Sequence, residues 1–281
     1  MNGSRARSDS RCPVFREPVG GPALTIPEPA VTGSDPPFPP DWTLQHFAEV
    51  DSTNLVAAAL PSWHAVRADT QTAGRGRFQR AWVSDAGGLW LSAVVPVVTN
   101  SPTWRLLPLV AGLAICETLR QTGAHPLRLR WPNDVLVGDR KLAGLLIDQF
   151  RPGLAVVGIG INVRNRPETQ ERLLQGQVAR LADLVPQAPS LHALAVRVLA
   201  ALKSNWLDVQ QDGPETVLAR INALWDLPRR VRLDLDGPKV SGDFLGVDAS
   251  GRLQLTPEGG PTQFFEPQDV KLLRDLGSEP S

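Results

Sequence analysis

An arginine- and glycine-rich run, Gly74-Arg75-Gly76-Arg77-Phe78-Gln79-Arg80-Ala81-Trp82, contains the residue types best suited to chemistry in this chain. Arginine carries a fixed fork of N–H donors that matches phosphate and carboxylate oxygens. Glycine lets the backbone approach a ligand closely, and the indole of Trp82 can stack on a flat ring. The run suits an anionic, aromatic ligand such as a nucleotide. The same composition also occurs in RNA-binding segments and in solvated surface loops.

Three further motifs place polar residues beside apolar runs. They are Val50-Asp51-Ser52-Thr53-Asn54, Gly158-Ile159-Gly160-Ile161-Asn162-Val163, and residues 130–144, which read Arg-Trp-Pro-Asn-Asp-Val-Leu-Val-Gly-Asp-Arg-Lys-Leu-Ala-Gly. Each motif alone has an ordinary structural interpretation. Ser52 or Thr53 can cap a helix, the Pro-Asn-Asp segment favours a turn, and Lys141 suits a solvated hairpin tip.

Taken in their order and spacing along the chain, the four motifs resemble the catalytic domain of biotin–protein ligases. The resemblance runs from about residue 44 to about residue 275. The resemblance implies an α+β fold, with a mixed β-sheet and helices packed against it as in class II synthetases. A small SH3-like β-barrel would follow. It also implies that ATP, with Mg²⁺, converts biotin to biotinyl-5'-AMP. The biotin is then transferred to a lysine of a biotin carboxyl carrier protein domain, such as that of acetyl-CoA carboxylase.

The resemblance assigns residues to each step. The catalytic set is Lys141, Arg75, Arg77 and Asp134. The biotin-binding set is Ser52, Thr53, Asn54, Gln71, Gly74, Arg75, Lys141, Gly144 and Gly160. The ATP-binding set is Arg77, Arg80, Trp82, Asn133 and Asn162, and no metal-ligating set is assigned.

These residue types fit the chemistry. In adenylation a carboxylate attacks a phosphate that is already negative, so cations at both groups lower the repulsion. The ureido ring of biotin is neutral and polar, and neutral partners suit it because a buried unpaired charge is costly. Two positions depart from the family pattern. Gln79 replaces a glycine of the arginine-rich run, and Arg130 replaces a lysine, which keeps the charge but changes its geometry.

Hydrophobic periodicity predicts the elements that position the motifs. We expect strands over 44–50, 64–68, 89–95 and 127–131, and a hairpin over 142–150 and 154–159. We expect helices over 102–121 and 190–209, and short strands after Trp225. The expected domains are a biotin- and ATP-binding catalytic domain over 41–225 and an SH3-like domain over 226–275.

Residues 1–40 are rich in Pro, Gly, Ser and Arg and are expected to be a disordered tail. They lack the helical periodicity of the DNA-binding module that some biotin–protein ligases carry, so the enzyme-only type without DNA binding is expected. Equal numbers of basic and acidic residues, 29 of each, argue against bulk attraction to nucleic acid.

Other sequence features limit the cellular locations and the metal or disulfide chemistry expected for the protein. No apolar run is long enough to span a membrane, and no secretory signal is evident. The two cysteines, Cys12 and Cys116, are far apart, and the four histidines show no metal-ligand spacing. A cytoplasmic protein without disulfides is expected, as a monomer or a homodimer.

Three other functions remain open. A ligase or transferase for lipoate or octanoate shares the architecture, although the arginine-rich run and the C-terminal barrel favour biotin. A catalytically silent, biotin-responsive regulator is a second alternative. The third is an Arg/Gly RNA-binding protein, against which the zero net charge argues.

Overall fold

The computed structural model describes residues 41–98, 101–169, 171, 174–225 and 229–276. The predicted tail, residues 1–40, lies outside them. The first part of the chain contains β1 (Thr43–Val50), α1 (Thr53–Ala57), β2 (His64–Gln71), η1 (Arg77–Gln79), β3 (Leu89–Pro96), η2 (Pro102–Leu106), α2 (Leu107–Arg120), β4 (Arg128–Arg130), β5 (Asp134–Val137), β6 (Arg140–Arg151) and β7 (Leu154–Ile161). The second part contains η3 (Pro167–Thr169), η5 (Leu181–Asp183), α3 (Leu191–Asp212), α4 (Glu215–Asn222), β8 (Arg229–Asp234), β9 (Lys239–Val247), β10 (Leu253–Pro257), β11 (Gln263–Phe265), η6 (Pro267–Asp269) and β12 (Leu272–Asp275).

A seven-stranded sheet in the order β1-β2-β3-β7-β6-β5-β4 forms the first layer. Strands β1 and β2 are parallel, and every other neighbouring pair is antiparallel. The mixed sheet predicted from the sequence is therefore confirmed. The expected hairpin is present as β6 and β7. Strand β6 is longer than predicted at both ends, and β7 is longer at its C-terminal end.

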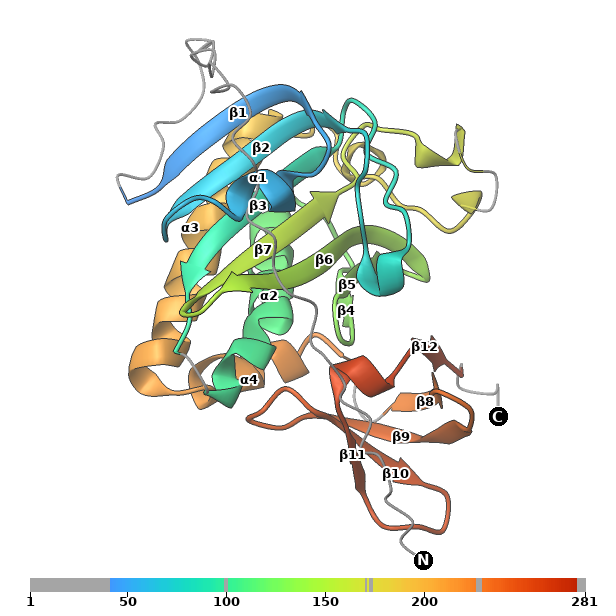
Figure 1. Cartoon of the computed structure of the whole chain (residues 1–281). Coiled ribbons are helices and arrows are strands. Elements are labelled where there is room, and N and C mark those ends of the chain that lie inside the picture. Colours follow the sequence, from blue (N-terminus) through green and yellow to red (C-terminus); the bar gives the residue numbers. More distant parts are fainter. Residues whose placement is uncertain (1–40, 99–100, 170, 172–173, 226–228, 277–281) are drawn as a thin grey trace, which may run out of the picture. The chain divides into compact units, whose positions relative to one another are not determined.

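The two faces of this sheet differ because successive side chains of a strand point to opposite sides. On β3, Leu89, Leu91, Ala93 and Val95 join the main apolar core, and alternate residues of β7 do the same. Helices α2 and α3 cover this face and lie behind the sheet in Figure 1. The helix-covered face thus holds most of the apolar contact of the first layer.

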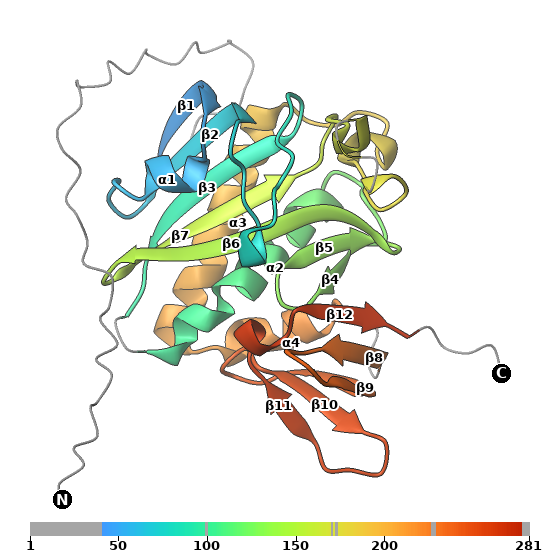
Figure 2. The same ribbon diagram turned by 45° about the vertical axis from the view of Figure 1, so that its right-hand side comes forward.

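Helix α1 covers only one end of the opposite face. A small apolar cluster there contains Ala57 of α1 with Val66, Val94 and Val156 from three strands. Beyond this cluster, the same face carries Ser92 on β3 and two glycines, Gly158 and Gly160, on β7. Figures 1 and 2 show the loop between β2 and β3 descending across β7 and β6 on this side.

The helices follow the predicted pattern with several differences, and α4 was not predicted. Residues 102–106 form the 3₁₀ turn η2, and α2 proper begins at Leu107 with Pro108 in its first turn, where a missing N–H is tolerated. Ser190 caps α3 by accepting a hydrogen bond from Ala193 N at 3.0 Å, and the helix runs on to Asp212. Ser52 stands at the N-cap of α1 but makes no side-chain cap bond, so that part of the capping interpretation was wrong.

A five-stranded antiparallel sheet, in the order β11-β10-β9-β8-β12, ends the chain. It is consistent with the small SH3-like domain that was predicted. The main core continues from Ile221 and Trp225 into Val231 and Phe244, so the second sheet shares apolar contact with the first part. The boundary predicted at residue 225 adjoins residues 226–228, which are not described, and the domain limits remain a prediction. No helix in the described ranges has the length and apolar character needed to cross a membrane.

Candidate active site

A cavity of about 890 Å³ opens on the face of the seven-stranded sheet that the long helices leave uncovered. Every site residue predicted from the sequence lines it except Gly74 and Asn162. The cavity is also lined by residues that the sequence did not single out, among them Leu174, Gln177 and the segment 270–275 next to and within β12. Four separate motifs therefore converge on one space.

The arginine-rich run folds into a hairpin that extends β2. Gln71 and Ser84 pair at its base, Arg75 and Ala81 pair further out, and Gly76 N donates to Arg80 O at 2.8 Å. At the tip, Phe78 and Gln79 both have positive φ, 56° and 58°. Gln79 stands where the family pattern has glycine. This left-handed conformation gives a physical reason for a glycine at that position.

Gly74 serves the hairpin rather than the cavity. Its carbonyl accepts a hydrogen bond from Trp82 N at 2.9 Å. A Cβ added at Gly74 would lie 2.4 Å from the carbonyl oxygen of Trp82 and 2.6 Å from Ser84 Oγ. Only a residue without a side chain lets the two arms of the hairpin cross here.

The three arginines of the run have different surroundings. Arg75 and Arg80 are exposed at the cavity, and no side chain among the described residues pairs with either. Arg77 is half-buried, bonds Asn133 Oδ1 at 3.4 Å and the carbonyl of Val270 at 3.3 Å, and also donates to the carbonyl of Pro267. Burial lowers the pKa of Arg77, which the negative charge of Asp134 partly offsets. Arg77 thus ties the hairpin to the C-terminal segment, while Arg75 and Arg80 remain available to an anion.

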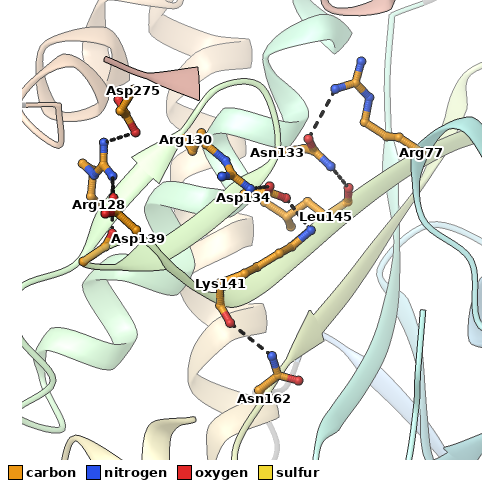
Figure 3. A network of polar contacts seen from close by, with 11 residues as sticks. Arg77, Arg128, Arg130, Asn133, Asp134, Asp139, Lys141, Leu145, Asn162 and Asp275 are labelled. Carbon is orange, nitrogen blue, oxygen red and sulfur yellow. Dashed lines mark hydrogen bonds and ion pairs between the residues drawn. The ribbon is translucent and has the colours of Figure 1, made fainter. Parts of the chain in front are cut away.

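Lys141 and Arg130 converge on Asp134, as Figure 3 shows. Lys141 Nζ lies 2.7 Å from Asp134 Oδ1, and Arg130 donates to Asp134 Oδ2 at 2.7 Å. Burial alone would raise the pKa of Asp134, but the charges and hydrogen bonds of Lys141 and Arg130 hold that pKa below its ordinary value. Lys141 is therefore not a solvated turn lysine. It is the second residue of β6, and its ammonium has a fixed partner.

The backbone of Lys141 is also held on both sides. Its N–H donates to Gln177 O at 2.8 Å, and its carbonyl accepts from Ala179 N at 2.9 Å. Asn162 Nδ2 donates to the same carbonyl at 3.3 Å. Asn162 Oδ1 accepts from Asn165, so the Asn162 side chain supports the start of β6 and does not face the cavity. Its predicted contact with ATP remains untested.

Trp82 lies across the two glycines that were predicted to face biotin. A Cβ at Gly160 would come within 2.7 Å of Trp82 Nε1, and one at Gly144 within 2.9 Å of the Trp82 ring. The Lys141 ammonium sits 4.8 Å from the centroid of the same ring, a cation–π distance. Gly144 and Gly160 are direct partners in β6 and β7, so the flat ring covers a flat, side-chain-free patch of sheet.

Neutral hydrogen-bonding groups form the wall opposite these cations. Gln71 Oε1 accepts from Thr53 N at 2.8 Å, and Gln71 Nε2 donates to Ser84 Oγ at 2.8 Å. Ser92 lies directly behind, fully buried, with its Oγ 2.7 Å from Thr53 Oγ1. Sequence reasoning missed Ser92. A single polar residue in the apolar run 89–95 was the available signal.

Asn133 has a supporting position. Its side-chain amide donates to Leu145 O at 2.8 Å, and its own carbonyl accepts from Leu145 N at 2.9 Å.

Within the part of the chain that the structure describes, no three His, Cys, Asp or Glu side chains gather as metal ligands would. The cavity therefore offers cations at one end and neutral polar groups at the other, which suits a ligand with a neutral polar head and an acidic tail.

Comparison with known proteins gives this arrangement a family. The model of the biotin/lipoate A/B protein ligase family matches residues 46–164. The biotin–[acetyl-CoA-carboxylase] ligase of Mycobacterium tuberculosis is 34% identical over 213 residues, which are 74% of this chain and 78% of that protein. The chain belongs to this ligase family. The bifunctional ligase/repressor BirA of Escherichia coli is 33% identical over 221 residues, 75% of this chain and 68% of BirA.

Solved structures of ligases agree with the fold. A biotin protein ligase from Aquifex aeolicus, determined in complex with biotin and ATP, superposes with a TM-score of 0.72 at 28% identity. The superposition covers 83% of this chain and 99% of the Aquifex protein. Since that coverage exceeds the span of the family model, the likeness extends well beyond residues 46–164.

Proposed function

We propose that this protein is a biotin–protein ligase that forms biotinyl-5'-AMP from biotin and ATP and transfers biotin to a lysine of a carrier protein domain. The observation that carries the proposal is one cavity in which a neutral polar wall, at Thr53 and Gln71, faces the Lys141–Asp134 pair. Biotin has a neutral polar ring at one end and a carboxylate at the other. The family relationship supports biotin over lipoate, because the relatives named above are biotin ligases.

The proposed orientation follows from charge. The ureido ring lies against Ser52, Thr53 and Gln71, where neutral donors and acceptors can pair with it without a buried unpaired charge. The valeryl tail extends from there toward the cationic end of the cavity and brings the carboxylate to Lys141 and Arg75. The nucleotide then occupies the part of the cavity lined by Arg77, Arg80 and Asn133.

In the first half-reaction, a carboxylate oxygen of biotin attacks the α-phosphorus of ATP, and pyrophosphate leaves. Both reacting groups are negative, so the cations of Lys141 and Arg75 lower the barrier most when water is excluded. Asp134 acts on Lys141 as a positioning residue, because its 2.7 Å contact holds the ammonium group in place at the cavity.

In the second half-reaction, the neutral amine of a carrier lysine attacks the acyl carbon of biotinyl-5'-AMP, AMP leaves, and the nitrogen releases one proton to solvent. The exposed guanidinium groups of Arg75 and Arg80 are placed to bind the departing phosphate. The carrier is a biotin carboxyl carrier protein domain, in keeping with the name of the Mycobacterium tuberculosis relative.

Mg²⁺ would enter as part of the MgATP substrate. Asp134 already pairs with two cations, so the phosphate oxygens supply most of the ligands to the ion. The ion neutralises phosphate charge and thereby assists the attack of the carboxylate.

Pyrophosphate–ATP exchange tests the proposal. The purified protein should catalyse exchange that depends on biotin and Mg²⁺, and a purified carrier domain should then gain the mass of one biotin. Lipoate and octanoate, measured in parallel, should give no more than background exchange. Exchange driven by lipoate or octanoate and not by biotin would contradict the proposal, as would full activity in excess chelator.

A further inference from the structure

A hydrogen-bonded chain runs behind the neutral wall of the cavity, from Asp148 on β6 through Asn54 and Ser92 to Thr53. Asn54 Nδ2 donates to Asp148 Oδ2 at 2.8 Å. Asn54 Oδ1 lies 2.6 Å from Ser92 Oγ, which lies 2.7 Å from Thr53 Oγ1. Ser92 and Asn54 are 0% and 4% exposed, so both side chains are buried.

The direction of each hydrogen bond in this chain follows from Asp148. An ionised carboxylate only accepts hydrogen bonds, so it holds the NH₂ group of Asn54 toward itself. The amide oxygen of Asn54 must then face Ser92, and since that oxygen has no hydrogen, Ser92 must donate to it. A serine hydroxyl has one hydrogen. Ser92 can therefore only accept from Thr53.

Gln71 gives Thr53 the same kind of partner from the other side. Ser84 donates its hydroxyl hydrogen to Trp82 O at 3.0 Å, so the NH₂ group of Gln71 faces Ser84 and its Oε1 faces Thr53. That oxygen accepts from Thr53 N at 2.8 Å and lies 3.0 Å from Thr53 Oγ1. The Thr53 hydroxyl thus has acceptors alone as protein neighbours, and its single hydrogen is taken by one of them.

Asn54 directs both ends of its amide toward protein groups. Its Nδ2 donates to Asp148 and its Oδ1 accepts from Ser92, although the side chain lines the cavity. Gly158 makes room for this arrangement, because a Cβ there would lie 2.4 Å from Asn54 Oδ1. In this network Asn54 acts as a positioning residue, and its predicted contact with biotin stays a prediction.

We propose that Asp148, acting through Asn54 and Ser92, fixes Thr53 as a hydrogen-bond acceptor toward the cavity and so selects substrates that present an N–H at that point. The inference rests on the proposed function in taking that N–H to belong to the ureido ring of biotin. A ring with oxygen at the same place would set two acceptors against each other and leave both unpaired.

An isosteric exchange of Asn54 and Asp148 tests this relay, the hydrogen-bonded chain from Asp148 through Asn54 and Ser92 to Thr53. In Asn54→Asp, two carboxylates face each other at the 2.8 Å contact, and the KM for biotin should rise about 100-fold. In Asp148→Asn, the Asn54 amide gains a second orientation, and this KM should rise only about threefold. The double variant restores one donor and one acceptor in opposite order and still presents an oxygen to Ser92. Its KM should return to within about threefold of the wild-type value, with kcat and the KM for ATP little changed throughout.

Discrimination between biotin and a substrate analogue gives a second test, because a purely structural role of Asp148 would not change it. The cyclic carbamate analogue of biotin, with one ring N–H replaced by oxygen, is compared with biotin for each of the two ring positions. Wild-type protein should discriminate against one of the two by about 100-fold in kcat/KM. In Asp148→Asn, a flipped Asn54 lets Ser92 donate to Thr53, so Gln71 Oε1 is left to hold the Thr53 hydrogen and that hydrogen can turn toward the substrate more easily. This variant should lose about tenfold of the discrimination, and the double variant should regain it.

Asp212→Asn, at an exposed position at the end of α3, is the matched control for a lost carboxylate and should change neither KM nor discrimination. Thermal unfolding of the four proteins measures the Asn54–Asp148 coupling without any substrate. Absence of biotin-dependent exchange in the wild-type protein would contradict the proposed function. The thermal unfolding of the four proteins would still test the hydrogen bond between Asn54 and Asp148. Active wild-type protein with an unrescued double variant, or with equal discrimination in all variants, would overturn the relay.

Discussion

The two faces of the seven-stranded sheet are built from the same strands and have opposite characters. On β3, Leu91 and Ser92 are adjacent and both fully buried, yet Leu91 packs into the core under α2 and α3, while Ser92 bonds Thr53 and Asn54. On β7, Ile159 joins the same core, and its neighbours Gly158 and Gly160 lie under Asn54 and Trp82. One face is filled by apolar volume and the other by directed polar contacts and glycine.

The difference teaches that stability and substrate recognition are divided between alternate residues. Packed apolar side chains contribute in proportion to the area they bury and need no particular ligand. Hydrogen-bond networks contribute little net stability but fix direction. Substitutions on the two faces should therefore separate unfolding free energy from KM.

The largest effects are expected at Leu91 and Ser92, two adjacent residues that lie on opposite faces of the sheet. Leu91→Ala should lower the free energy of unfolding by about 2–5 kcal/mol, because it leaves a cavity in the core, and should leave the KM for biotin unchanged. Ser92→Ala should cost only about 1 kcal/mol and raise that KM about tenfold. Urea unfolding and exchange kinetics on both variants check this. Equal changes in KM would refute the division.

Lys141→Ala should lower the rate of adenylate formation by about 10²–10³, as expected when a charge-assisted contact at a developing charge is lost. The free energy of unfolding should change by less than about 1 kcal/mol, because the Lys141 side chain is 29% exposed. Lys203→Ala removes a lysine paired with Asp41 outside the cavity and serves as the control. Normal turnover of the Lys141 variant would remove it from the mechanism.

Asp134→Asn should lower the free energy of unfolding by about 1–2 kcal/mol at pH 7, because Lys141 and Arg130 lose their shared partner. The pKa of Asp134 is held below its ordinary value, so its contribution is complete above the ordinary aspartate pKa, about 3.9, and is lost as pH falls through the folded value. The difference in the free energy of unfolding between wild type and variant should thus stay constant from about pH 7 to 5 and become smaller below about pH 4. Denaturant unfolding across this range measures it, and a difference that became larger in acid would contradict the assignment.

The smallest expected effect is at the tip of the arginine hairpin. Gln79→Gly relieves a left-handed residue, but it also adds freedom to the unfolded chain, so the net gain should be below about 1 kcal/mol. Phe78→Gly, with nearly the same φ, is the matched variant at the neighbouring residue. Thermal unfolding distinguishes the outcomes, and a clear loss of stability in Gln79→Gly would show that the tip is not strained.

Local patterns in the sequence contained much of the chemistry. The resemblance carried by their motifs assigned to the site a set of residues that all line one cavity: Arg75, Arg77, Arg80, Asn133, Asp134 and Lys141. Strand and helix positions followed from periodicity, which depends on residues a few places apart. One error was also local, because Ser52 stands at the N-cap of α1 without a side-chain cap bond. The alternative of a solvated hairpin tip for Lys141 is excluded by its place in β6 and its contact with Asp134.

Contacts between distant residues decided the rest. Asn54 and Asp148 are 94 residues apart, and Arg77 reaches the carbonyl of Val270 across 193 residues. Asn162 and Gly74 sit in motifs that pointed to a ligand, yet packing assigns one to the backbone of Lys141 and the other to the base of a hairpin. A sequence specifies which donors and acceptors are present and which face of a strand each occupies. Only the tertiary structure brings those groups within 3 Å of one another, and hydrogen-bond direction depends on that proximity.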